Sequence, residues 1–152
     1  MIRLSRLADY GVALAGRMAN SPERYFNAFE LAGAAGLPAP TVSKILAMLA
    51  RGGVLISQRG AKGGYCLARG PSEITLAEII GALDGPIALT LCLEQGDGAC
   101  DVEQLCPSRR GWQRINESIR KAFEEVSLAE MCAPGMFIGP LAAPVSNAEA
   151  GS

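Results

Sequence analysis

The fold is decided by residues 36–51, which read GLPAPTVSKILAMLAR. Prolines 38 and 40 indicate the start of a helix. Backbone N–H groups in the first helical turn have no intrahelical acceptor, so proline, which lacks an N–H, is tolerated there. Apolar residues then follow with the i, i+3, i+4, i+7 spacing of a buried helical face: Val42, Ile45, Leu46 and Leu49. The opposite face carries Lys44, Ala47 and Arg51, flanked by Ser43 and Met48. We therefore expect a helix that buries one side and offers a basic side with small residues to a partner.

Two helices are predicted before this one and a hairpin after it. Ser5 is a suitable N-cap for a helix running to about Asn20, and a short helix over Ala28–Ala35 would end at Gly36. Gly52-Gly53 ends the third helix. Two β-rich runs, 54–57 and 65–68, then flank a basic, glycine-rich turn at 58–64, as in a hairpin.

These elements together predict a winged helix-turn-helix DNA-binding domain over residues 1–70. In such a domain the third helix enters the major groove, and the hairpin lays basic side chains against the backbone or minor groove. A phosphate-binding loop is disfavoured, because the turn lacks the GxxxxGK[ST] arrangement. Taken alone, Lys44 and Arg51 would fit an ordinary solvated helix face. Together with the wing, they instead favour contact with DNA. The candidate DNA-contacting residues are Thr41, Ser43, Lys44, Arg51, Arg59 and Lys62.

The charge distribution supports the same division of the chain. The 152 residues are about half hydrophobic and carry a net charge of −1. Residues 1–70 have nine basic and three acidic side chains, whereas the remainder has five basic and twelve acidic ones. A basic half next to an acidic half indicates a polyanion partner for the first and a different task for the second.

The second half is predicted to contain connections, a loop and a dimerisation helix. Residues 71–91 form a connecting helix, which a capping box at Thr75–Glu78 opens, and a loop, and residues 92–106 form a cysteine loop. Residues 107–132 hold a long helix from about Ser108 to Glu125 and a short terminal helix that begins with a capping box at Ser127–Glu130. Residues 133–152 are expected to be disordered. The long helix has a heptad-like seam of Trp112, Ile115, Ile119, Ala122 and Val126. The fold class is thus mainly α with a small β-hairpin wing, and the seam predicts a homodimer, which suits a palindromic double-stranded DNA operator.

The cysteine and histidine content limits the chemistry. The chain has five Cys and no His, which excludes Ser-His-Asp and Cys-His catalysis, Cys₂His₂ zinc fingers and His-ligated haem. Cys92, Cys100 and Cys106 lie in a polar loop and indicate a metal or redox site, an iron–sulfur cluster or zinc being the choices for soft thiolates. Cys66 and Cys132 fit small buried hydrophobes. No apolar leader or membrane span is evident, so we expect a cytoplasmic protein. There is no acid/base constellation of the kind that acts on a substrate, so we do not expect an enzyme.

Several motifs resemble a known group of bacterial regulators. They are Arg3-Leu4-Ser5 with Asp9-Tyr10, the wing sequence from Gln58 to Tyr65, Asp84-Gly85-Pro86-Ile87, and the three loop cysteines. Over residues 1–132 the chain resembles the IscR/NsrR/RirA group of transcription regulators, and most of all the branch that controls suf genes for iron–sulfur cluster assembly. The resemblance implies a homodimeric repressor with a 2Fe–2S or 4Fe–4S cluster on Cys92, Cys100 and Cys106, sensing cluster supply, iron or nitric oxide. It also implies that Arg59 enters the minor groove.

Two departures from this group leave alternatives open. The IscR branch has a histidine ligand shortly after the third cysteine, where this chain has Pro107-Ser108-Arg109. Asp9 matches the aspartate that serves as the fourth ligand in the nitric-oxide-sensing branch, although an acid there would also favour the helix dipole. Other candidates are Glu94, Asp97, Asp101, water or a small thiol. Pro40 and Ser43 replace base-reading residues of the IscR branch, so its operator sequence does not transfer. A zinc or thiol-based DNA binder is the competing hypothesis.

Overall fold

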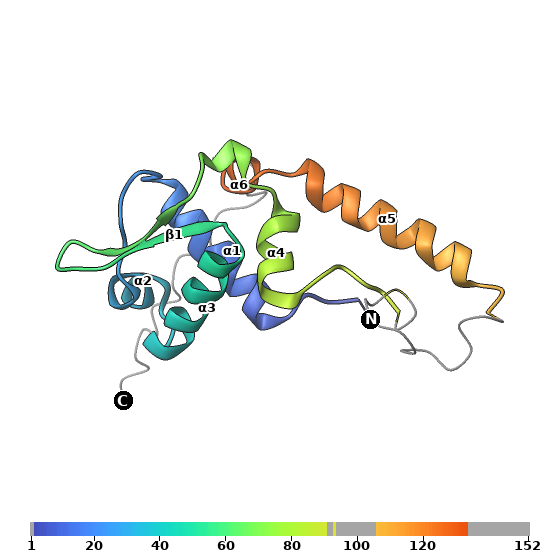
Figure 1. Ribbon diagram of the computed structural model, residues 1–152, viewed down its shortest axis with the longest axis horizontal. Helices are drawn as coiled ribbons and strands as arrows, with labels where there is room; N and C mark the ends of the chain where they lie inside the picture. The colour runs from blue at the N-terminus through green and yellow to red at the C-terminus, as the bar shows by residue number, and fades with distance from the viewer. Residues whose placement is uncertain (1, 91–92, 94–105, 134–152) are drawn as a thin grey trace, which may run out of the picture.

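The computed structural model describes residues 2–90, 93 and 106–133. Three helices come first, α1 (Arg6–Ala19), α2 (Ala28–Ala35) and α3 (Ala39–Arg51), followed by strands β1 (Leu55–Gln58) and β2 (Gly64–Leu67). A 3-10 turn, η1 (Pro71–Glu73), precedes α4 (Leu76–Asp84), and α5 (Arg109–Glu125) and α6 (Leu128–Met131) follow the cysteine loop. The mainly helical fold with one antiparallel hairpin is as predicted, and the hairpin and α5 project from opposite sides of the helical body (Figure 1).

Local capping explains where the helices begin and end. The Ser5 hydroxyl accepts from the Ala8 amide at 3.1 Å, and the Asn27 side chain accepts from the Glu30 amide at 2.7 Å. Helix α2 ends at Gly36, whose φ of 66° is left-handed. Helix α3 begins after Pro38 without a side-chain cap, so its start depends on the proline backbone. The predicted bounds of the first two helices are therefore confirmed.

The core lies where α1, α3 and α4 meet. The predicted buried face of α3 is fully enclosed, since Val42, Ile45, Leu46 and Leu49 are each 0 % exposed. Gly11 of α1 permits close packing against α4, because a Cβ at this position would lie 2.1 Å from Cδ1 of Leu83. Burial of this kind is the main stabilising contribution to a domain of this size.

The hairpin pairs Leu55 with Leu67 and Gln58 with Gly64. Its strands lie nearer the turn than the sequence predicts, by one residue at each end. Val54 falls outside the first strand because its amide donates to the Leu49 carbonyl at 3.0 Å and so completes the end of α3.

Helix α5 leaves the body and α6 returns to it. None of the α5 residues is buried, whereas Leu128 of α6 is 0 % exposed and belongs to the main core. Two backbone hydrogen bonds hold this return, from Leu76 to the Val126 carbonyl at 3.0 Å and from Leu128 to the Ile74 carbonyl at 2.8 Å. The predicted end of the long helix at Glu125 and the capping box at Ser127 are confirmed.

Two predicted features lie outside the described residues. They are most of the cysteine loop, including Cys92 and Cys100, and the expected disorder of residues 134–152. In the part of the chain that is described, no single helix is long and apolar enough to cross a membrane. Helices α2 and α3 taken together reach the length and composition of a span, but they are bent by 118°.

Candidate nucleic-acid interface

Helix α3 presents a basic stripe opposite its buried face. Pro40, Ser43, Lys44 and Arg51 are exposed, and Thr41 and Ala47 are half-buried at the edges of the stripe. The stripe exists because the 3.6-residue period places positions 40, 44, 47 and 51 on one side once positions 42, 45, 46 and 49 enter the core. The exposed side therefore carries short side chains, among them the hydroxyls of Thr41 and Ser43, and only Lys44 and Arg51 extend far from it.

The cations of this stripe and of the wing are free to meet an anionic partner. Within the described residues, the side chains of Lys44, Arg51, Arg59 and Lys62 form no ion pair or hydrogen bond. All four are exposed. When such free cations bind DNA phosphates, the counterions condensed on the DNA are released. This release is the main source of sequence-independent DNA affinity.

Glycine allows the tight wing turn that carries Arg59 and Lys62. A Cβ at Gly63 would lie 2.2 Å from the Gln58 carbonyl oxygen, and one at Gly64 would lie 2.3 Å from the Phe26 carbonyl oxygen. Gly64 also has a φ of 143°, which side-chain-bearing residues rarely adopt. The turn itself is closed by the Gly63 amide, which donates to the Gly60 carbonyl at 3.0 Å.

The base of the wing is joined to the segment before α2. Phe26 and Tyr65 exchange two backbone hydrogen bonds of 2.8 Å, which add a third backbone segment to the hairpin. The Arg24 guanidinium lies 4.5 Å over the Phe26 ring and pairs with Glu30. This anchor keeps the hairpin at a set position relative to α2, and sequence periodicity missed it because a single bridge leaves no repeating pattern.

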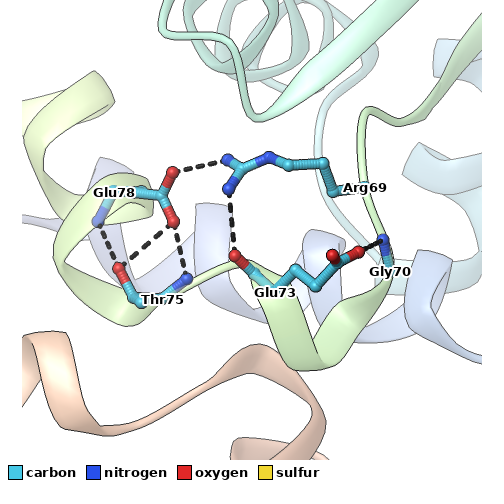
Figure 2. Close-up of polar contacts among 5 residues, drawn as sticks. All are labelled: Arg69, Gly70, Glu73, Thr75 and Glu78. Atoms are coloured by element: carbon cyan, nitrogen blue, oxygen red, sulfur yellow. Dashed lines mark hydrogen bonds and ion pairs between the residues drawn. The ribbon is translucent and has the colours of Figure 1, made fainter.

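Arg69 connects the end of the wing to the start of α4. Figure 2 shows its guanidinium between two acceptors, the Glu73 carbonyl at 2.9 Å and the Glu78 carboxylate. The same carboxylate accepts from the Thr75 amide at 2.9 Å, closing the capping box that the sequence predicts. Burial alone would raise the pKa of Glu78, but the hydrogen bonds from Arg69 and Thr75 outweigh it and hold the pKa below its usual value.

A second surface, the α5 seam, lies on the side of the chain away from the wing. Trp112 is 40 % exposed and Ile115 is 47 % exposed, and a shallow apolar groove runs along Ile115, Ile119 and Ala122. Val126, predicted as the last seam residue, instead follows the helix end and packs against the core with Phe123. Phe123, which was not part of the predicted seam, is half-buried and lines a pocket with Ile80 of α4.

The described residues hold part of the predicted ligand set. Cys106 is half-buried immediately before α5, and Asp9 is exposed in the first turn of α1, where its carboxylate forms no described ion pair. No group of three or more Cys, Asp or Glu side chains comes together among residues 2–90, 93 and 106–133. Near Asp9, Ser5 donates to the Asp84 carboxylate and so joins the start of α1 to the end of α4.

The two remaining cysteines have the surroundings of structural residues. The buried Cys66 thiol donates to the Pro22 carbonyl at 3.1 Å, and burial together with the charge of Glu23 raises its pKa. Burial also raises the pKa of the Cys132 thiol, whose sulfur lies 2.7 Å from the place a Cβ on Gly16 would take. A raised pKa keeps both thiols protonated, which is unfavourable for a metal ligand.

Comparison with known proteins gives these surfaces a context. Residues 4–134 match the family described as "Rrf2: Iron-dependent Transcriptional regulator". The chain is 32 % identical over 110 residues to an rrf2-like HTH-type transcriptional regulator of Rhodobacter capsulatus, covering 70 % of this chain and 73 % of that protein. These relatives are transcriptional regulators, which confirms the prediction that the chain is not an enzyme.

Two solved structures share the fold. CymR of B. subtilis, described as the global cysteine regulator, superposes with a TM-score of 0.68 at 26 % identity, covering 87 % of this chain and 97 % of that one. IscR of T. potens superposes with a TM-score of 0.66 at 25 % identity, covering 91 % of this chain and 93 % of that one.

Proposed function

The chain belongs to the Rrf2 family of transcriptional regulators, and from this membership we propose that it acts as a homodimeric repressor with an iron–sulfur cluster. The cluster would report iron–sulfur or iron status, and the regulated genes would be suf-type assembly genes. The observation that carries the proposal is the arrangement along one chain: an exposed basic stripe on α3, a thiol-rich loop, and an amphipathic helix, α5, that begins just after Cys106 and has no buried residue.

The DNA-binding part of the proposal depends on α3 and the wing. Thr41, Ser43 and Lys44 would enter the major groove with α3, and Arg51 would reach the phosphates beside it. Arg59 and Lys62 would contact the backbone or minor groove. Their exposure and lack of internal partners support this role. Operation in the cytoplasm follows from the same proposal, since the chromosome is the partner.

The dimer part depends on the α5 seam. An amphipathic helix with no buried residue leaves its apolar side in water, which is unfavourable unless a second chain covers it. Pairing α5 with its copy would give two-fold symmetry, and two α3 helices would then read a palindromic operator.

The cluster part depends on the donor chemistry. Cys92, Cys100 and Cys106 would hold the group, and soft thiolates suit iron–sulfur clusters. Asp9 is the proposed fourth donor and would come from the partner chain, which would place the site across the dimer interface. The cluster supplies a group that responds to iron, oxygen or nitric oxide. If the forms with and without the cluster differ in their affinity for DNA, gain or loss of the cluster shifts the population between DNA-bound and free repressor.

The test is anaerobic purification followed by visible absorbance and DNase footprinting of the holo and apo forms. Wild-type protein should be coloured, and Cys→Ala changes at 92, 100 and 106 together should abolish the colour. Cys66→Ala is the matched control and should retain it, since that thiol lies in the wing strand. A coloured triple variant would refute the ligand assignment.

A zinc or thiol-based regulator is the second candidate, favoured by the similarity to the cysteine regulator CymR. It predicts colourless protein that still footprints an operator. Stoichiometric zinc that is lost in the triple cysteine variant would select zinc, whereas metal-free protein whose footprint depends on thiol oxidation would select redox sensing.

A further inference from the structure

The exposed side of α3 has an unusual inventory for a helix expected to read bases. Its residues are Pro40, Thr41, Ser43, Lys44, Ala47, Met48 and Arg51. None is Asn, Gln, Asp or Glu, the side chains that accept hydrogen bonds from the amino groups of adenine or cytosine. Apart from the hydroxyls of Thr41 and Ser43, the polar groups of the stripe are the donors of Lys44 and Arg51. Strong contacts to bases must therefore be to acceptor atoms on the base edges.

Lys44 is the donor best placed to reach a base edge. It lies in the N-terminal half of α3, the part of a recognition helix that meets the bases. Arg51 lies seven residues further on, in the last turn, which is about 10 Å along the axis at 1.5 Å per residue. That distance places Arg51 toward the DNA backbone, where it would contribute affinity rather than sequence information.

The neighbours of Lys44 allow close approach. Pro40 and Ala47 lie four residues before it and three after it, so they adjoin it on the helix surface. Both are short and cannot form side-chain hydrogen bonds, so along this line of the helix no side chain holds the backbone of α3 away from the groove floor. Thr41 and Met48, the other neighbours of Lys44, are half-buried at the sides of this line. The ammonium is exposed and has no ion pair among the described residues.

We infer that Lys44 is the specificity-determining residue of α3 and reads a guanine in each half-site through its major-groove O6 and N7. Guanine presents two adjacent acceptors there, whereas adenine places an amino donor beside its N7 and cytosine offers a donor alone. The inference rests on the DNA-binding role proposed above and is independent of the cluster.

The experiment selects operators from a randomised duplex library and then measures affinity for duplexes with single changes. Wild-type protein should select one guanine per half-site, and its replacement should weaken binding by about tenfold to a hundredfold. Replacing that guanine by 7-deazaguanine, which lacks N7, should also weaken binding. Inosine, which keeps O6 and N7 but lacks the minor-groove amino group, should bind as guanine does.

Variants of the protein separate this reading from general affinity. Lys44→Ala should reduce the cost of changing the guanine to about twofold or less, and Lys44→Arg should restore the preference because arginine also donates to O6 and N7. Lys62→Ala is the matched control and should weaken binding to all sequences alike, with a shallower salt dependence. Circular dichroism checks that each variant keeps its helices.

The outcomes distinguish the inference from the proposed function. If wild-type protein selects no sequence at all, the operator-binding role itself fails. If it selects an operator but Lys44→Ala keeps the guanine preference, or if no guanine is selected, only the role of Lys44 fails. A strong loss of affinity when inosine replaces the guanine would show that the guanine is read from the minor groove. That result would also overturn the inference about Lys44.

Discussion

The side-chain amide of Asn116 on α5 bonds the backbone on either side of Ala88, in the segment that leaves α4 for the cysteine loop. Its Nδ2 donates to the Ile87 carbonyl at 2.9 Å, and its Oδ1 accepts from the Leu89 amide at 3.1 Å. Asn116 therefore joins α5 to the entrance of the loop that contains the candidate ligands Cys92 and Cys100.

Replacing Asn116 by Leu removes both hydrogen bonds and leaves two half-buried backbone groups without this partner. We expect the free energy of unfolding to fall by about 1–2 kcal/mol, measured by urea denaturation. Gln113→Leu is the matched control, because this amide is exposed, forms no hydrogen bond among the described residues and should change stability little. Equal effects of the two substitutions would argue against the Asn116 contacts.

A charge in the α5 seam should separate the dimer without unfolding the chain. Ile115 is 47 % exposed in the single chain, so Ile115→Glu costs the monomer little but buries an unpaired carboxylate in the proposed interface. Sedimentation velocity should show monomers for this variant. Gln113→Glu, on the opposite side of the helix, should remain dimeric, and a dimeric Ile115→Glu protein would place the interface elsewhere.

Gly64→Ala should disrupt the wing. The new Cβ would lie 2.3 Å from the Phe26 carbonyl oxygen at a φ of 143°, so backbone must move. We expect a loss of at least about 1 kcal/mol in stability together with weaker DNA binding in a gel-shift assay. Gly33→Ala provides the contrast, because this helical position has open space and should gain about 0.5–1 kcal/mol.

Leu128→Ala should loosen the attachment of α5. Leu128 is 0 % exposed and lies in the main core, so its truncation should cost about 2–5 kcal/mol in thermal or chemical unfolding. Met131→Ala, on the same short helix but 43 % exposed, should cost less than about 0.5 kcal/mol. Comparable losses for the two variants would contradict the role of α6 as the anchor.

The Arg69–Glu78 contact predicts a pH dependence. Because the pKa of Glu78 is lower in the folded chain than its usual value of 4.5, the carboxylate contributes stability above pH 4.5. This contribution is lost as pH falls through the folded-state pKa. Glu78→Gln keeps the capping box but cannot titrate, so the stability difference between wild type and variant should shrink below pH 4.5. A constant difference down to pH 3 would rule out this linkage.

Much of the helical architecture could be predicted from local sequence. Ser5, Asn27, Thr75 and Ser127 each precede a helix start, and the i, i+3, i+4, i+7 pattern of α3 identifies both its buried face and its exposed stripe. These features depend on residues within two helical turns of one another, so no knowledge of the fold is required. The candidate DNA-contacting residues of α3 could therefore be named from the sequence alone.

The helices, the hairpin and the character of each surface follow from the sequence alone, since capping and periodicity act over a few residues. Contacts between residues far apart in the chain emerge only in the folded molecule. Sequence patterns do not predict the Phe26–Tyr65 bridge, the contact of Arg69 with Glu78 across nine residues, or the Asn116 contacts across 27 and 29 residues. Such contacts have no periodic signature, because each depends on where the packed core places two distant segments.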